Sequence, residues 1–279
     1  MPRAVRRICE AIMYKTESDR IIVDVADLDV KATLECGQLF RFEKIDDAYI
    51  VKSGAHTCRI VNSGSSVVIE TPSTDFFVNF FSLDRDLNRA KRELSRFPEL
   101  KDALDSCGAL RILHQPLFET IISFIISANN NIPRIKGIIN RLCAQFGDEF
   151  PSPDKLATMQ IRQLYAIGCG YRSRYILESA KICAETDLLN RLYSARTPDA
   201  AKLLMTLPGV GQKIADCVML FALGRLEVFP IDTWMIKTQR QGMETEMQLR
   251  TRLMGKYGEL AGYAQQFLYY YSAILREKV

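Results

Sequence analysis

Long hydrophobic runs are absent from this 279-residue sequence. Its most apolar stretch, residues 117–126, is interrupted by polar side chains and is shorter than the roughly 18 residues that cross a membrane. Hydrophobic residues make up 48% of the chain and charged residues 25%, as is usual for a globular protein with a full core. The composition therefore argues against a membrane protein and against a mostly disordered one.

Patterns that bind metals are also scarce. The sequence has 8 cysteines and 2 histidines, no two cysteines stand in a C-x-x-C pattern, and none follows Cys217. In a chain of this length, scattered cysteines favour free thiols in a reducing compartment over a disulfide framework. We therefore expect no zinc site, no iron–sulfur cluster and no cofactor, and we expect the protein to act inside the cell.

A strong charge of one sign is missing as well. The chain has 37 basic and 33 acidic residues, which gives a net charge of +4 at pH 7. This charge permits binding to nucleic acid without establishing it. The function has to be inferred from motifs.

Two kinds of pattern divide the chain. Short β-branched segments separated by polar or glycine breakers are typical of an antiparallel sheet, and they occur at residues 21–25, 48–51, 57–61 and 66–70. Helical patterns dominate the rest, and we expect helices at residues 118–128, 131–146, 172–185, 199–205, 212–223, 244–256 and 261–276. We predict an α+β protein with a sheet-rich domain at residues 1–110 and an all-helical domain with a helix-hairpin-helix motif at residues 111–279.

The hairpin lies at residues 203–223, where two helices flank the turn LPGVG at 207–211. The two glycines let the backbone turn sharply and approach another surface closely. The N–H groups at the start of the second helix then form an anion site, into which a DNA phosphate fits without base reading. The alternative is a plain turn between two helices.

Lys213 stands in the first turn of the second helix, where the helix dipole disfavours a cation. A neutral amine there is a nucleophile that can form a Schiff base, and the alternative is a lysine that only touches phosphate. Asp232 follows Pro230 in an apolar segment and either caps the next helix or acts as a catalytic carboxylate. The two residues taken together favour the catalytic interpretation.

Residues 207–216 and the segment Pro230-Ile231-Asp232 resemble the helix-hairpin-helix-GPD superfamily of DNA base-excision glycosylases. Further segments are similar to its 8-oxoguanine DNA glycosylase/AP lyase type, namely ECGQLFR at 35–41, SANNNIPR at 127–134, GCGYRSRY at 168–175 and GYAQ at 262–265. The resemblance covers about residues 20–276 in the expected order, and it implies a TBP-like sheet in the N-terminal domain.

The resemblance implies a bifunctional enzyme of base excision repair. In that family the hairpin lysine, here Lys213, attacks the sugar C1′, displaces the damaged base and forms a Schiff base that permits β-elimination. Asp232 would stabilise the positive charge that develops on the sugar. The lesion must leave the base stack for this attack. The implied substrate is double-stranded DNA with 8-oxoguanine opposite cytosine, and we expect the enzyme to act as a monomer.

The resemblance also implies a pocket for the flipped base, formed by Gly37, Cys217, Phe221, Gln265 and Tyr269. The carbonyl of Gly37 would read N7–H, the donor that distinguishes 8-oxoguanine from guanine. Cys217 and Tyr269 would stack on the base, and Gln265 would bond its Watson–Crick edge. Without the resemblance, these positions on helix faces would be read as core residues and a surface amide.

The implied DNA contacts are Asn129, Arg134, Tyr171, Arg172, Gly209, Val210 and Gly211. Arg134 and Arg172, together with the asparagine, suit hydrogen bonds to the orphaned cytosine, and Tyr171 corresponds to a wedge that fills the duplex. The alternatives are a helix cap and solvated arginines. A structural cation, as in relatives, would be held by the backbone carbonyls of Met205, Leu207 and Val210.

The sequence departs from the family pattern in three places, one of which is the segment 242–250, shorter here than in larger relatives. Trp234 stands where better-known members have a histidine that touches phosphate, and Tyr269 replaces a phenylalanine. Two alternative functions remain open. An endonuclease III-like glycosylase for other oxidised bases also has the hairpin lysine, but it carries four C-terminal cysteines for an iron–sulfur cluster. A non-catalytic hairpin module would only grip the DNA backbone.

Overall fold

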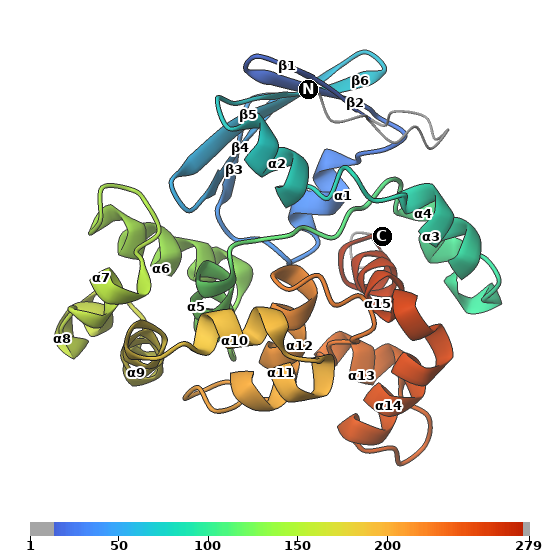
Figure 1. Ribbon diagram of the computed structural model, residues 1–279. Helices are drawn as coiled ribbons and strands as arrows, with labels where there is room; N and C mark the ends of the chain where they lie inside the picture. The colour runs from blue at the N-terminus through green and yellow to red at the C-terminus, as the bar shows by residue number, and fades with distance from the viewer. Residues whose placement is uncertain (1–13, 276–279) are drawn as a thin grey trace, which may run out of the picture.

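The computed structural model describes residues 14–275. Its strands are β1 (Tyr14–Glu17), β2 (Arg20–Asp24), β3 (Phe42–Ile45), β4 (Ala48–Ser53), β5 (His56–Ser63) and β6 (Ser66–Glu70). They form one antiparallel sheet in the order β1-β2-β6-β5-β4-β3 (Figure 1). The four predicted strands are confirmed. β1 and β3 were not predicted, because each is four residues long and mostly exposed, so neither carries an alternating apolar pattern.

One face of the sheet is buried. Ile21 pairs with Ile69 and Val23 with Val67 in register, and all four side chains are inside. Two helices, α1 (Val30–Glu35) and α2 (Thr74–Phe80), pack on this face and contribute aromatic and aliphatic side chains to the same core cluster. Each such side chain contributes about 1.5–3 kcal/mol when fully buried, so the cluster holds the sheet and its helices together.

The rest of the described chain, up to residue 275, is mainly helical, which confirms the α+β prediction (Figure 1). Its α-helices are α3 (Leu87–Leu94), α4 (Lys101–Ser106), α5 (Leu117–Ser127), α6 (Ile132–Ala144), α7 (Pro153–Ala157), α8 (Ile161–Ala166), α9 (Arg172–Glu185), α10 (Leu188–Ser194), α11 (Thr197–Leu204), α12 (Gln212–Phe221), α13 (Thr233–Gln239), α14 (Glu246–Tyr257) and α15 (Ala261–Tyr269). Two short 3₁₀ turns are η1 (Pro98–Leu100) and η2 (Gly258–Leu260). The helix predicted at 261–276 is α-helical only to Tyr269 and continues as a π-helical turn, η3 (Tyr270–Leu275).

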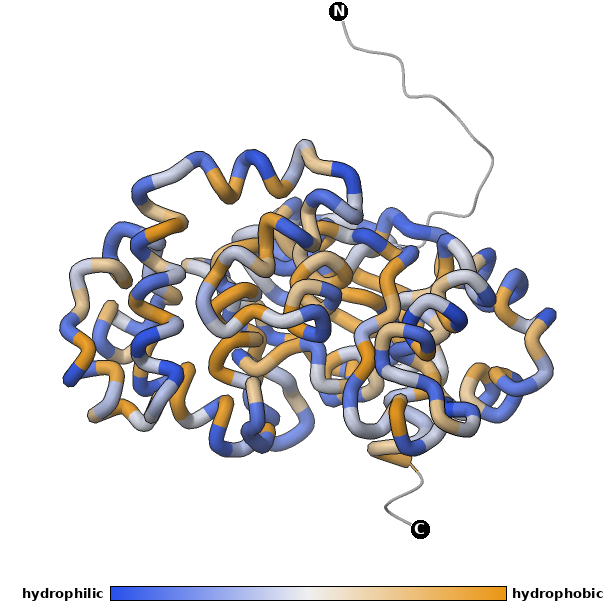
Figure 2. Tube along the Cα trace, turned by 90° about the horizontal axis from the view of Figure 1, so that it is seen from below, coloured by the Kyte–Doolittle hydropathy of each residue, from blue (hydrophilic) through white to orange (hydrophobic). Residues whose placement is uncertain are grey.

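The apolar helix α5 is central to the helical part. Ten of its residues, Leu117 to Ile126, are buried, and α6, α9 and α12 pack around it. Figure 2 shows hydrophobic stretches of the trace running through the middle of the molecule and hydrophilic stretches along much of its outline. Within residues 14–275, no helix combines the length and apolar character that crossing a membrane requires.

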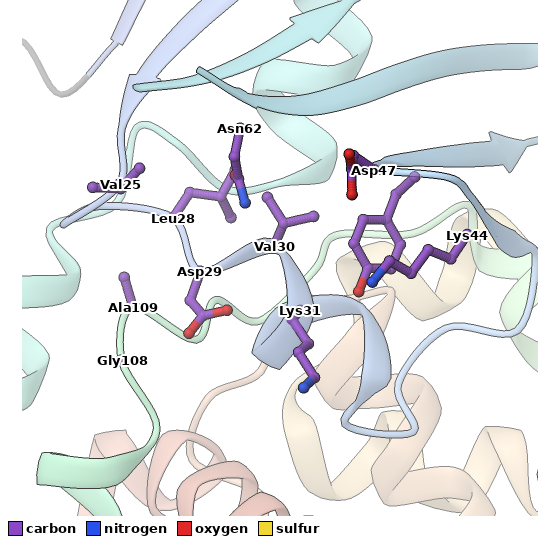
Figure 3. A pocket seen from close by; sticks show the side chains of 11 residues that line it. Val25, Leu28, Asp29, Val30, Lys31, Lys44, Asp47, Asn62, Gly108 and Ala109 are labelled. Carbon is purple, nitrogen blue, oxygen red and sulfur yellow. The ribbon is translucent and has the colours of Figure 1, made fainter. Parts of the chain in front are cut away.

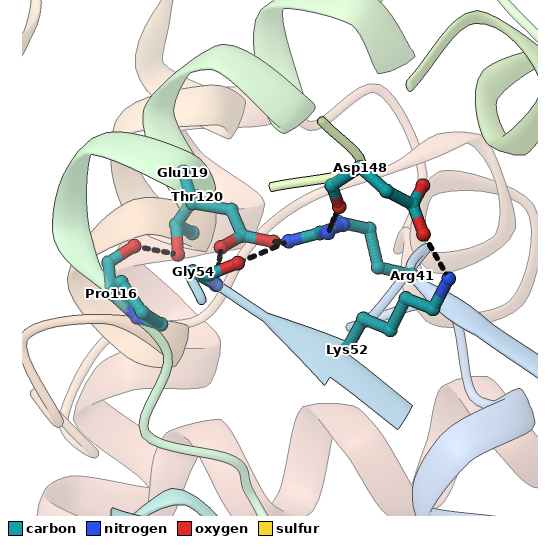
Figure 4. A network of polar contacts seen from close by, with 7 residues as sticks. All are labelled: Arg41, Lys52, Gly54, Pro116, Glu119, Thr120 and Asp148. Atoms are coloured by element: carbon teal, nitrogen blue, oxygen red, sulfur yellow. Dashed lines mark hydrogen bonds and ion pairs between the residues drawn. The ribbon is translucent and has the colours of Figure 1, made fainter. Parts of the chain in front are cut away.

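Buried polar contacts join the sheet to the helices (Figure 4). Arg41 forms an ion pair with Glu119 of α5 at 3.2 Å and donates to the carbonyl of Asp148 at 2.9 Å. Glu119 also accepts the N–H of Gly54, in the β4–β5 turn, at 2.6 Å. Apolar packing also joins the two parts, because Phe40, which precedes β3, belongs to the hydrophobic core of the helical part. The division into domains at residue 110 remains a prediction.

Candidate active site and DNA-facing surface

One cavity contains both predicted catalytic residues. It is lined by Cys36, Gly37, Phe124, Lys213, Cys217, Phe221, Pro230, Asp232, Gln265, Gln266 and Tyr269. All five residues implied for the base pocket belong to this set. Sequence reasoning missed Cys36, Phe124, Pro230 and Gln266. Two of these, Cys36 and Gln266, adjoin predicted pocket residues, which was the only signal the sequence offered for them.

Lys213 reaches the cavity from the first turn of α12, after Gly211 as N-cap. It is half-buried, and its Nζ lies 5.4 Å from the centre of the Phe124 ring. Phe124 in turn stacks on Phe221, with ring centres 5.6 Å apart. Burial raises the pKa of the Cys217 thiol to about 11, so this side chain is neutral at physiological pH. Phe124, Phe221 and Cys217 therefore form an uncharged part of the cavity wall.

Asp232 combines the two functions that the sequence left open. It is the N-cap of α13, where its Oδ1 accepts the N–H of Met235 at 2.8 Å, and it also lines the cavity. Burial raises the pKa of Asp232, while the bond from Met235 and the positive charge of Lys213 oppose that rise. The cap holds the carboxylate in place on the wall of the cavity that Lys213 shares.

Gly37 lies opposite Tyr269. Its φ of +79° lies in the left-handed region, and a Cβ at this position would lie 3.4 Å from the Tyr269 hydroxyl. Two hydrogen bonds of Gln115 connect this loop to α12. The Gln115 side chain donates to the carbonyl of Gln38 at 2.7 Å, and the N–H of Gln115 donates to the carbonyl of Phe221 at 2.7 Å. The Gly37 loop is thus tied to the end of α12, the helix that carries Lys213.

The turn between α11 and α12 has the geometry expected of a helix-hairpin-helix. Gly209 has φ +80°, and a Cβ there would lie 2.6 Å from Cδ2 of Tyr175. Gly211 is exposed and has open space around its Cα, so the N-terminus of α12 is accessible. Val210 is buried and donates its N–H to the carbonyl of Leu207 at 3.1 Å. One of the carbonyls expected to hold a cation therefore already accepts a hydrogen bond.

Tyr171 projects beside the hairpin and is 51% exposed. Its ring lies 4.5 Å from the guanidinium of Arg172 and meets the Tyr175 ring edge-on at 6.0 Å. Asn129 and Arg134 are also exposed, and Asn129 has φ +48°, a conformation that asparagine tolerates better than most residues. The exposed tyrosine thus packs against Arg172 and Tyr175.

Arg172 differs from the expectation that its side chain is available to a DNA base. It is only 3% exposed, and its guanidinium donates to the carbonyls of Ala128 and Asn129, the latter at 2.8 Å. A guanidinium turned inward in this way positions the loop that carries Asn129. Sequence pattern could not reveal this, because the bonded carbonyls lie on a different element.

Trp234 lies on α13, two residues after Asp232, and is half-buried. The Nζ of Lys237 lies 4.8 Å from its ring centre. An indole with a stacked cation therefore occupies the position where the family pattern has a histidine. The pair offers an aromatic surface and a positive charge on the same helix.

Metal ligands do not cluster in the described part of the chain: no group of three His, Cys, Asp or Glu residues suited to an ion occurs there. The seven cysteines within residues 14–275 are buried and free. Another hollow lies beside α1 in the sheet-bearing part, with Asp29, Lys31 and Lys44 among its side chains (Figure 3). It contains none of the predicted site residues, so the cavity with Lys213 and Asp232 is the candidate active site.

Comparison with known families agrees with this geometry. Residues 20–121 match the 8-oxoguanine DNA glycosylase N-terminal domain, and residues 122–258 match the HhH-GPD superfamily of base excision DNA repair proteins. The chain belongs to the 8-oxoguanine DNA glycosylase family. This family assignment covers both the sheet-bearing part and the helical part that together enclose the cavity.

Several relatives support the assignment. The N-glycosylase/DNA lyase OGG1 of Arabidopsis thaliana is 31% identical over 283 residues, which cover 87% of this chain and 77% of that protein. The solved 8-oxoguanine glycosylase/lyase of Clostridium acetobutylicum, bound to double-stranded DNA with cytosine opposite 8-oxoguanine, is 30% identical with a TM-score of 0.86. That match covers 96% of this chain and 99% of the other. A 3-methyladenine DNA glycosylase from Archaeoglobus fulgidus, 15% identical with a TM-score of 0.71, shares the fold.

Proposed function

We propose that this family member excises 8-oxoguanine from duplex DNA and then cleaves the strand at the resulting site, with Lys213 as nucleophile. One observation carries the proposal: the hairpin lysine, the half-buried carboxylate of Asp232 and the whole implied base pocket line a single cavity. A non-catalytic hairpin module does not require such a cavity. The relatives named glycosylase/lyase support the same chemistry.

The proposed reaction begins when Nζ of Lys213, after giving up a proton, attacks C1′ of the flipped nucleotide. A bond from Nζ to C1′ forms as the bond from C1′ to the base breaks, and the base leaves with the electron pair and takes up a proton. The carboxylate of Asp232 stabilises the positive charge that develops on the sugar. Opening of the sugar ring gives an iminium, loss of a C2′ proton follows, and the C3′–O bond breaks.

Recognition of the base is proposed to use the uncharged walls of the cavity. The carbonyl of Gly37 accepts from N7–H of 8-oxoguanine, and Gln265 bonds the Watson–Crick edge. Cys217 and Tyr269 stack on the two faces of the base, with Phe221 beside them. The support is geometric, since all five residues line the cavity and a Cβ added at Gly37 would be in van der Waals contact with Tyr269.

DNA outside the pocket is proposed to bind along the hairpin and the loops beside it. The exposed N-terminus of α12, with Gly209, Val210 and Gly211, takes a backbone phosphate. Tyr171 enters the duplex as a wedge, and Asn129 and Arg134 hold the cytosine left behind, while Arg172 positions their loop. The backbone carbonyls of Met205, Leu207 and Val210 are proposed to hold a structural cation. The enzyme is proposed to act as a monomer with two domains that divide at residue 110.

Borohydride trapping on a duplex with 8-oxoguanine opposite cytosine tests the proposed nucleophile. We expect the wild type to form a covalent adduct, and Lys213→Gln to form none and to cut no strand while still binding the DNA. Lys101→Gln is the matched control, because Lys101 is an exposed lysine on α4, away from the cavity. A wild type that forms no adduct, or a Lys213→Gln variant that still cuts, would overturn the proposal.

A further inference from the structure

Gln266 is a buried amide in the cavity with no role assigned so far. Gln266 is only 3% exposed, and it lines the same cavity as Lys213. Its Nε2 donates to Oε1 of Gln265 at 2.6 Å. Its own Oε1 is buried and has no hydrogen-bond partner among the described residues. The other two buried side-chain atoms in this condition, in Ser173 and Arg225, belong to residues outside the cavity.

An unpartnered carbonyl oxygen inside a protein is unfavourable, because the group has lost its water without gaining a donor. In a binding cavity such an atom has a simple explanation: a donor on the ligand completes the bond. A site built in this way rejects analogues that lack the donor, because the protein atom is then left unpaired. The oxygen of Gln266 therefore indicates a ligand with a hydrogen-bond donor facing α15.

The base of the proposed substrate has two such donors next to each other. The Watson–Crick edge of 8-oxoguanine carries N1–H and the exocyclic amino group, whereas adenine has an acceptor at N1. The helix α15 carries two consecutive amides at the cavity: Oε1 of Gln265 accepts from Nε2 of Gln266, and Oε1 of Gln266 is the acceptor left unpaired among the described residues. The bond between the two amides fixes the orientation of Gln265, so that the pair acts as one unit.

We propose that Gln266 is a further specificity-determining residue, whose Oε1 accepts a hydrogen bond from the exocyclic amino group of the flipped base while Gln265 takes N1–H. This inference rests on the proposed function and names a recognition contact within it. With this contact the enzyme would recognise the 2-amino group of the purine in addition to the N7–H group that oxidation creates.

The test compares excision of 8-oxoguanine with excision of 8-oxohypoxanthine, which lacks only the 2-amino group, under single-turnover conditions and opposite cytosine. We expect the wild type to prefer 8-oxoguanine by about tenfold, which corresponds to about 1.4 kcal/mol. Gln266→Met keeps the length of the side chain but removes its acceptor, so it should slow excision of 8-oxoguanine about tenfold and lose most of this preference. Leu268→Met, a buried change on α15 outside the cavity, is the matched control.

Three results would overturn the inference: no preference by the wild type, a wild-type rate for Gln266→Met on 8-oxoguanine, or an equal loss by that variant on both bases. The wild-type preference can be measured without any variant, so it tests the inference even if Gln266→Met folds poorly. Cleavage of a duplex with a ready-made abasic site separates this inference from the proposed function. A wild type that cuts neither abasic nor 8-oxoguanine DNA refutes the function, whereas one that cuts both without the preference refutes only the role of Gln266.

Discussion

A single carboxylate, that of Asp232, both caps α13 and faces the cavity with Lys213. The two uses are compatible because capping engages Oδ1 with the N–H of Met235, which fixes the side chain without neutralising its charge. If Asp232 only capped α13, its role would explain how the helix begins but not why its side chain lines the cavity. Substitution by asparagine separates the two, since asparagine caps helices about as well as aspartate.

We therefore expect Asp232→Asn to slow excision roughly a hundredfold, the order of magnitude lost when one electrostatic stabiliser is removed, with little change in thermal stability or DNA affinity. The pH–rate profile provides a second measure. Because burial raises the pKa of Asp232, its active carboxylate becomes protonated at a higher pH than an ordinary aspartate, and excision should fall as the pH drops through that value. The variant should lack this acidic decline, and a wild-type rate in the variant would remove Asp232 from the mechanism.

At the scale of the element, the hairpin depends on its two glycines for different reasons. Gly209 needs its positive φ, and its Cα is packed against the Tyr175 ring, which in turn contacts Tyr171. Gly211 has φ −96° in extended backbone with open space around it, so its value lies in leaving the end of α12 uncovered. Glycine is thus needed at position 209 for the backbone conformation of the turn, and at position 211 to keep the N-terminus of α12 accessible.

Alanine at the two positions should therefore act differently. Gly209→Ala should lower stability by about 1–3 kcal/mol, the range for a residue forced into an unfavourable backbone region, and should weaken DNA binding by displacing Tyr175. Gly211→Ala, its matched control, should leave stability nearly unchanged. Thermal unfolding and DNA titration of both variants measure these effects, and equal losses of stability would contradict this account of the turn.

For the whole molecule, the cavity exists only because the sheet-bearing part is held against the helices. Gly37 comes from the former and Lys213 from the latter, and the buried pair of Arg41 and Glu119 links the two parts near α5 (Figure 4). Arg41 ends the segment that begins with the Gly37 loop. A contact outside the cavity therefore bears on how the base-reading carbonyl is placed.

Breaking this pair from one side should be costly, because it leaves a buried charge without its partner. We expect Arg41→Met to lower the free energy of unfolding by about 3–5 kcal/mol, and the double variant with Glu119→Gln to recover part of that loss. Arg174→Met is the control, since Arg174 and Glu178 form an exposed pair of small energetic value. Denaturant unfolding of Arg41→Met, Glu119→Gln, the double variant and the control gives four values, and additive losses in the double variant would show that the pair is not coupled.

The sequence by itself determined the elements and motifs whose signals are local. Alternating β-branched residues specified four strands, helical periodicity placed Lys213 and Cys217 on one face of α12, and the LPGVG turn required its glycines. The weakly patterned β1 and β3 could not be found in this way, because short exposed strands bury too few side chains to leave a period.

Only the tertiary structure decided which distant segments meet. It brought Gly37 close to Tyr269, turned Arg172 inward onto the Asn129 loop, and left the buried side-chain oxygen of Gln266, a residue that lines the cavity, without a partner in the described part of the chain. Such contacts depend on how elements pack and on which carbonyls lack donors, and no pattern within a single element records either. The physical reason is that hydrogen bonding and burial are satisfied across the whole fold, whereas periodicity reports only one helix or strand at a time.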